Sequence, residues 1–123
     1  LRLLLDEHRA SWEAAVDLVS RCFSLRVGEG ERDARVPLEA VAALQPRDAG
    51  LIRALNEKLC GRLWDAWPGD WQRIGENALL RDGEADLVTL CAACCGKIIC
   101  TKERRAGSLR AMYTLAPARF EDI

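Results

Sequence analysis

Apolar residues along this chain recur mostly every three or four positions, which is the spacing of a helix that buries one face. The clearest stripe, at Ile52, Leu55 and Leu59, follows Pro46, a residue suited to the first turn of a helix, and it stops before Pro68. The helices predicted in this way cover residues 3–25, 37–45, 46–67, 70–81, 84–106 and 109–113.

We find no run of alternating β-branched residues and no internal repeat, so the sequence predicts an all-α fold. The expected architecture is a single domain, a compact bundle of about five to six helices. Within it, residues 1–83 are predicted to form a helical part of unknown role, and residues 84–123 a C-terminal region packed on it. Glycines and charges over residues 28–35 predict an exposed loop.

Composition narrows the class of protein. The chain has 123 residues, of which 50% are hydrophobic and 30% charged, which is typical of a globular domain and not of disorder. Lys and Arg number 18 against 19 Asp and Glu, so no basic excess favours a nucleic acid or an anionic membrane as partner. The chain opens on an apolar run without Met, which we interpret as a piece of a longer protein.

Four of the six cysteines lie within ten residues, at Cys91, Cys94, Cys95 and Cys100. On one continuous helix this spacing does not suit a structural disulfide, and a reducing cytoplasmic or nuclear compartment fits it better. Four thiolates are also enough for a tetrahedral zinc site, which we keep as the alternative. Because no second pair lies on a separate loop, we favour buried thiols, no metal and no other cofactor.

Catalysis finds little support in the sequence. Nucleophilic cysteines need a base, and the sole histidine, His8, falls on the apolar stripe of the first predicted helix. We therefore predict that the chain is not an enzyme. Trp64, Trp67 and Trp71 surround a Pro-Gly break, and we interpret them as packing residues at a corner between two helices.

Two C-terminal motifs carry a resemblance to a known family. On a helix, Leu90, Cys94 and Ile98 form one narrow ridge, with the small residue Ala93 beside it. Downstream lies the segment 115–120, with the sequence Leu-Ala-Pro-Ala-Arg-Phe. The first motif resembles the BC box that binds elongin C, and the second resembles a cullin box. Together they resemble the C-terminal region of SOCS-box ubiquitin-ligase substrate receptors.

The resemblance implies a non-enzymatic adaptor of a cullin-RING ubiquitin ligase that holds an unknown protein substrate. Its implied partners are the elongin B/elongin C pair and a cullin. The implied elongin C-binding residues are Leu90, Cys94 and Ile98, and the implied cullin-binding residues are Leu115, Pro117 and Phe120. Two alternatives stay open: a helical interaction domain of the death-fold or viral Bcl-2-like kind, and a zinc-stabilised helical module.

Overall fold

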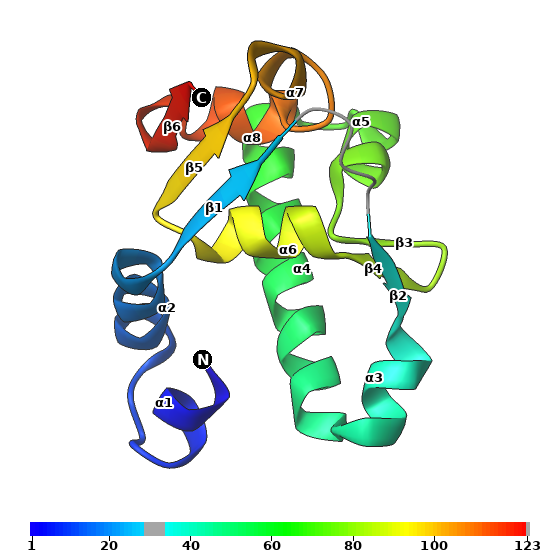
Figure 1. The fold of residues 1–123 in the computed structure, drawn as a ribbon. Helices are drawn as coiled ribbons and strands as arrows, with labels where there is room; N and C mark the ends of the chain where they lie inside the picture. Colours follow the sequence, from blue (N-terminus) through cyan, green and yellow to red (C-terminus); the bar gives the residue numbers. More distant parts are fainter. Residues whose placement is uncertain (29–33, 123) are drawn as a thin grey trace.

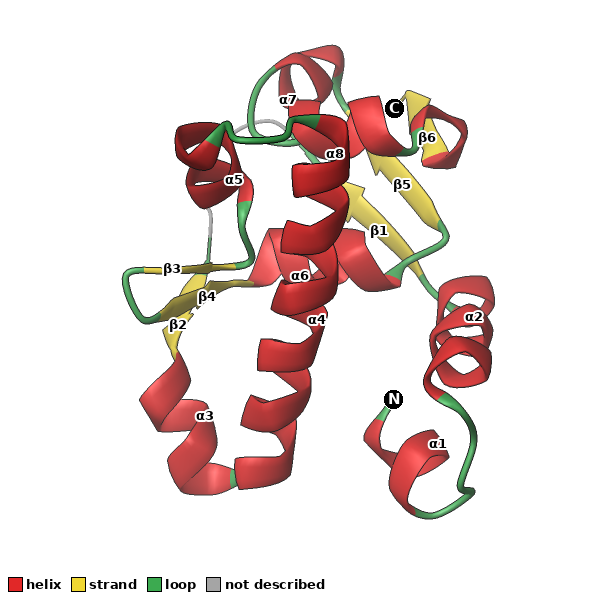
Figure 2. Ribbon diagram, turned by 180° about the vertical axis from the view of Figure 1, so that it is seen from behind, coloured by secondary structure: helices red, strands yellow, loops and turns green. Residues whose placement is uncertain are grey.

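Helices and short strands are interspersed along the chain in the computed structural model, which describes residues 1–28 and 34–122 (Figures 1 and 2). The helices of these residues are α1 (Arg2–Asp6), α2 (Trp12–Cys22), α3 (Leu38–Leu44), α4 (Pro46–Ala66), α5 (Trp71–Asn77), α6 (Leu87–Cys94), α7 (Lys102–Ala106), α8 (Arg110–Leu115) and the 3-10 helix η1 (Pro117–Arg119). The strands are β1 (Ser24–Val27), β2 (Arg35–Pro37), β3 (Leu80–Arg81), β4 (Glu84–Asp86), β5 (Lys97–Cys100) and β6 (Phe120–Asp122). The predicted all-α bundle of five to six helices is therefore wrong, and the fold is mixed α/β.

The long helix α4 forms the centre of the molecule, and α6 crosses it (Figure 1). Its predicted apolar stripe is confirmed, because Ile52, Leu55, Leu59 and Leu63 are all buried in the core. Pro46 stands in its first turn as the sequence indicated. A stripe of this length identifies a helix reliably, because many turns repeat the same period.

A parallel sheet with the strand order β1-β5-β6 replaces parts of two predicted helices. Ser24 pairs with Lys97 and Val27 with Cys100, so the first two strands come from positions more than seventy residues apart. The predicted helix over residues 84–106 was wrong because a short apolar run such as residues 98–100 suits a buried strand as well as a helix. Here pairing with β1 decides the outcome by burying Ile98 on β5.

Gly96 explains where α6 ends and β5 begins. Its amide donates to the carbonyl oxygen of Ser20 at 2.8 Å, which brings the last turns of α2 against this link. A Cβ at position 96 would lie 2.3 Å from that same oxygen, so only glycine fits without movement of the backbone. The residue predicted to sit inside a helix therefore serves as the point of close approach between two segments.

The second sheet is antiparallel and has the order β2-β4-β3. Asp82 and Gly83 join β3 to β4, with φ angles of 53° and 76°. Positive φ at both central residues is the conformation of a tight two-residue hairpin, for which Asp-Gly is a favoured sequence. The predicted helix over residues 70–81 is therefore too long, because α5 ends at Asn77 and residues 80 and 81 form β3.

The first predicted helix, over residues 3–25, is also divided. Arg9 adopts a φ of 51° between α1 and α2, and the Ser11 side chain then caps α2 by accepting from the amide of Ala14 at 3.2 Å. Most of the loop predicted at 28–35 lies outside the described residues. Among the described residues, no helix combines the length and apolar character that crossing a bilayer requires.

Both sheets join strands from the two segments that the sequence analysis separated. β1 lies before residue 83 and pairs with β5, which lies after it. β2 also lies before residue 83 and pairs with β4, which lies after it. The proposed division into residues 1–83 and 84–123 stays a prediction.

Candidate functional site

The residues predicted to bind elongin C do not share one helical face. Leu90 and Cys94 lie on α6 and pack, half-buried, against the core. The helix ends at Cys94, and Ile98 lies beyond it on β5 with no exposed surface. The continuous ridge expected from the sequence is therefore absent, because the chain changes from helix to strand between its second and third members.

The three residues predicted to bind a cullin do not form one exposed surface. Leu115 and Phe120 pack against the core, and the Phe120 ring meets Tyr113 edge to face, with ring centroids 5.2 Å apart. Pro117 is exposed at the start of η1. Packing of the C-terminal segment accounts for two of the three side chains.

All six cysteines are free thiols, and Cys95 and Cys100 are buried. Burial raises the pKa of the Cys94 thiol to about 11, with further contributions from Cys95 and Cys91. A raised pKa keeps this sulfur protonated at neutral pH, which opposes nucleophilic attack. Within residues 1–28 and 34–122, no group of three or more His, Cys, Asp or Glu side chains is placed to hold a metal ion. The alternative zinc set at Cys91, Cys94, Cys95 and Cys100 therefore finds no support.

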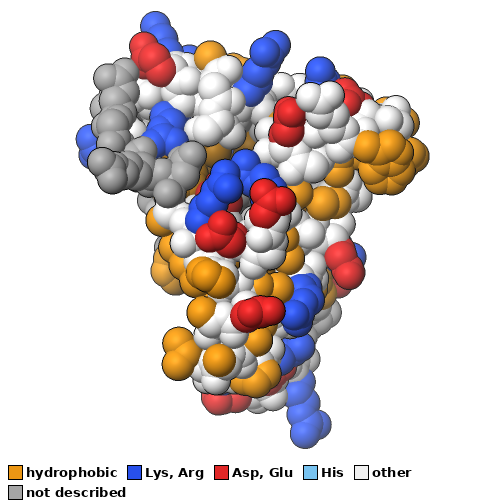
Figure 3. Space-filling view, turned by 90° about the vertical axis from the view of Figure 1, so that its right-hand side faces the viewer, with side chains coloured by type: hydrophobic (Ala, Val, Ile, Leu, Met, Phe, Trp, Pro, Cys, Tyr) orange, Lys and Arg blue, Asp and Glu red, His pale blue; other side chains and the backbone are white. Residues whose placement is uncertain are grey.

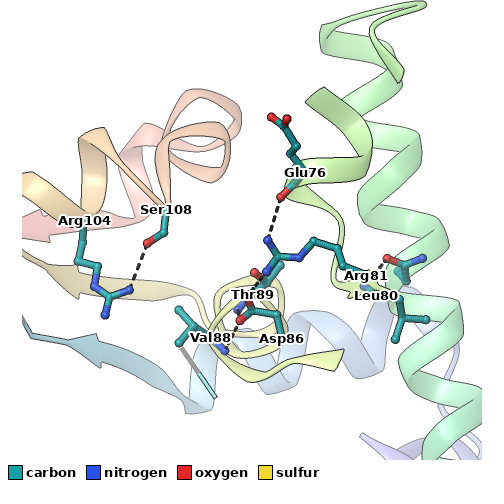
Figure 4. A network of polar contacts seen from close by, with 9 residues as sticks. Glu76, Leu80, Arg81, Asp86, Val88, Thr89, Arg104 and Ser108 are labelled. Carbon is teal, nitrogen blue, oxygen red and sulfur yellow. Dashed lines mark hydrogen bonds and ion pairs between the residues drawn. The ribbon is translucent and has the colours of Figure 1, made fainter. Parts of the chain in front are cut away.

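A partly buried ion pair that the sequence did not indicate fixes the hairpin to its surroundings (Figure 4). Arg81 contacts the Asp86 carboxylate and also donates to the carbonyl oxygen of Glu76 at 3.0 Å. Asp86 caps α6 by accepting from the amides of Val88 and Thr89 at 3.0 and 3.2 Å. This network ties the hairpin to both α5 and α6, and it holds the Arg81 side chain in one position.

Two exposed tryptophans form a second feature. Trp71 opens α5 and is 70% exposed, and Trp64 on α4 is 40% exposed. Their ring centroids lie 4.8 Å apart with the planes tilted by 36°. Trp67 is half-buried and covered by the guanidinium of Arg73 at 4.8 Å. The prediction that all three indoles are packing residues is wrong for Trp71, which turns its surface to solvent.

Trp71 borders a shallow hollow of about 590 Å³ between α5 and the β3–β4 hairpin, which we call the α5 hollow. The residues that line it are Arg35, Trp71, Gln72, Gly75, Glu76, Leu80, Arg81 and Asp82. Figure 3 faces the side of the molecule that carries α5 and the hairpin, and hydrophobic surface there lies beside acidic and basic side chains. One exposed indole next to carboxylate, amide and guanidinium groups makes this hollow the candidate binding site.

Comparisons with known proteins point away from the resemblance inferred from the C-terminal motifs. No protein-family model matches the chain. Over 92 residues, 73% of its length, the chain is 32% identical to glycogen phosphorylase of Bacillus subtilis. Over 96 residues, 76% of its length, it is 27% identical to the muscle form of glycogen phosphorylase of Ovis aries and 26% identical to that of Homo sapiens.

The chain spans only 11 to 12% of the length of these relatives. The similarity extends over about three quarters of the chain, far more than the two short C-terminal motifs cover. The predicted resemblance to SOCS-box substrate receptors is therefore wrong. Motifs of three or four positions matched by chance, because small and apolar residues are common in any packed segment.

Proposed function

We propose that this chain acts within a glycogen-phosphorylase-like protein and that its α5 hollow holds a chain of glucose units. The observation that carries the proposal is the 32% identity over 92 residues to glycogen phosphorylase of Bacillus subtilis. The name of that enzyme gives glycogen as the polymer on which it acts. Because the chain spans 12% of that relative, the role proposed for it is to bind the polymer. Bond cleavage is assigned to the remainder of such a protein.

The side chains of the α5 hollow suit a neutral sugar. A pyranose ring presents C–H groups on its two faces and hydroxyl groups around its edge. The exposed indole of Trp71 offers a flat apolar surface to one face. Carboxylates of Glu76 and Asp82 and the amide of Gln72 supply acceptors and donors for the hydroxyl edge. Sites for small polar ligands combine such groups in this way.

Several contacts hold this surface in place before any ligand arrives. Trp64 packs beside Trp71 and limits the rotation of its ring. Gln72 donates to the Glu76 carboxylate at 3.1 Å, and Arg81 is fixed by Asp86 and by the Glu76 carbonyl. Groups that are already ordered lose less conformational entropy on binding, so the hollow supports affinity for an otherwise flexible oligosaccharide.

Isothermal titration of the chain with maltoheptaose tests the proposal. We expect the variant Trp71→Ala to weaken binding by about tenfold, since an aromatic anchor at a binding surface commonly contributes more than 1 kcal/mol. The control is Leu44→Ala, which removes an exposed apolar side chain on α3 that does not line the hollow. Absence of any heat of binding, or equal affinity of the Trp71→Ala chain, would contradict the proposed function.

The adaptor role predicted from the sequence is tested by neither the fold nor the comparisons. Its expected partners, elongins B and C and a cullin, stay predictions, as do the absence of catalysis and the cytoplasmic or nuclear location. The same holds for the alternative of a helical interaction domain.

A further inference from the structure

A small cavity of about 110 Å³ lies beside the Arg81–Asp86 pair, where α4, α5, α6 and the turn before α8 meet. Part of its wall is made of buried apolar side chains: Leu59, Leu63, Leu109, Ala111 and Met112. The rest is polar and includes the hydroxyl groups of Thr89 and Ser108. Only Glu76 and Arg81 also line the α5 hollow, so the cavity is a separate space.

One donor in the wall of this cavity has no partner. Arg81 donates through Nη1 to the carbonyl oxygen of Glu76 at 3.0 Å, and its Nη2 contacts the Asp86 carboxylate. Its Nε atom is buried, yet it finds no hydrogen-bond acceptor within residues 1–28 and 34–122. A buried N–H group without an acceptor is unfavourable, because folding has removed the water that it would otherwise bind. An oxygen atom of a ligand in the cavity would satisfy this donor.

The charges around the cavity favour a neutral ligand. The guanidinium of Arg81 is already paired with Asp86, and Figure 4 shows the Glu76 carboxylate turned away from that pair. Glu76 accepts instead from the side-chain amide of Gln72 at 3.1 Å. An anion in the cavity would be repelled by the Asp86 carboxylate, and a cation would be repelled by Arg81.

The remaining wall calls for hydroxyl groups on a short carbon chain. A hydroxyl both donates and accepts, so Thr89 and Ser108 pair well with other hydroxyl groups. Ser108 accepts from Arg104 at 3.2 Å, which leaves its own hydrogen for an acceptor. The apolar side chains opposite suit C–H groups. A cavity of about 150 Å³ is known to hold benzene, so this smaller one holds about six non-hydrogen atoms or fewer.

We propose that the cavity binds a short neutral polyol of the size of glycerol. One hydroxyl oxygen accepts from the Nε–H of Arg81, and other hydroxyl groups pair with Thr89 and Ser108. The C–H groups lie against apolar residues such as Leu63 and Met112. A glucose ring has twice as many non-hydrogen atoms as glycerol and is too large for this space. The site is therefore distinct from the glucan site and does not rest on the proposed function.

Met112 supplies a direct readout of this site. It is the only methionine of the chain, and it lines the cavity but not the α5 hollow. We expect its methyl resonance, observed by NMR after carbon-13 labelling of the methionine methyl group, to shift saturably when glycerol is added. The expected dissociation constant is on the order of 1 mM or weaker, because so small a ligand makes few contacts. 1-Propanol keeps the carbon chain but only one hydroxyl, so it should bind more weakly.

Two variants and a matched control test the named contacts. Thr89→Val removes a hydroxyl with little change of shape, and Arg81→Lys removes the Nε–H but keeps the positive charge. Each should weaken glycerol binding by about fivefold, the usual loss for one hydrogen bond. The control is Thr114→Val, which removes an exposed hydroxyl on α8 that does not line the cavity. Thr89→Val decides the outcome if the Arg81→Lys chain does not fold.

Three results would overturn the proposal. The first is a shift of the Met112 resonance that never saturates, which would leave water as the partner of Arg81. The second is equal affinity for 1-propanol and glycerol, and the third is equal affinity of the Thr89→Val and Thr114→Val chains for glycerol. Because Trp71 does not line the cavity, the Trp71→Ala chain should bind glycerol normally. Failure of the glucan site is therefore distinguishable from failure of this one.

Discussion

The two sheets of this protein are small, yet they are stabilised differently. The parallel sheet β1-β5-β6 joins distant segments and is held by buried side chains such as Val27, Ile98 and Cys100. The antiparallel sheet β2-β4-β3 is built around a two-residue turn and is held by the Arg81–Asp86 pair. One sheet depends on packing between remote parts of the chain, and the other depends on local geometry and polar contacts.

Each sheet also borders a hollow. The hollow beside the carboxyl end of α2 is lined by the first residues of β1 and β5, Ser24 and Lys97. The α5 hollow is lined by Arg81 and Asp82 of the β3–β4 hairpin. Damage to one sheet should therefore affect its own hollow before the other. The comparison teaches that each hollow depends on the stability of the strands that line it.

The largest effect is expected from Gly96→Ala in the parallel half. The new Cβ would lie 2.3 Å from the Ser20 carbonyl oxygen, which is backbone and cannot rotate away. Overpacking of this severity should lower the free energy of unfolding by about 3 kcal/mol, measured by urea denaturation. The control, Gly61→Ala on α4, adds a methyl group to open space and should stabilise the chain by about 1 kcal/mol. Similar stability of the two variants would show that the contact between α2 and the link from α6 to β5 is loose.

An intermediate effect is expected from Asp86→Asn in the antiparallel half. Asparagine still caps α6, but the partly buried guanidinium of Arg81 loses its charged partner. Arg81 keeps some exposure to water, so we expect a loss of about 2 kcal/mol, less than for a fully buried pair. Asp70→Asn is the control, because Asp70 also caps a helix and contacts an arginine, but at the surface. Its expected cost is below about 0.5 kcal/mol, and equal losses in chemical denaturation would mean that burial of the first pair is unimportant.

The smallest effect is expected from Gly83→Ala in the hairpin turn. At a φ of 76° alanine is strained by its Cβ, while nothing around position 83 lies close enough to clash. The cost should therefore be conformational only, about 1 kcal/mol. Gly83→Asn should cost less, since asparagine tolerates this region of φ and ψ. Thermal melts of the two variants compare them directly, and an asparagine variant less stable than the alanine variant would argue against the turn conformation.

The sequence by itself determined the elements that repeat one local rule many times. The stripe from Ile52 to Leu63 predicted α4, and Pro46 marked its beginning. Asp70 likewise indicated the start of α5, which it caps through the amide of Arg73. These features need only the period of a helix and the chemistry of its first turn, both of which are encoded in neighbouring residues.

Only the tertiary structure decided the strands and both hollows. Ile98 lies in an apolar run too short to distinguish strand from helix, and its pairing with Leu25 settles the choice. Arg62 and Arg119 stand far apart in the sequence, and each alone resembles an ordinary surface cation. Folding around α4 places them at the hollow beside the carboxyl end of α2, because packing of remote segments, and not local periodicity, sets which charges lie together.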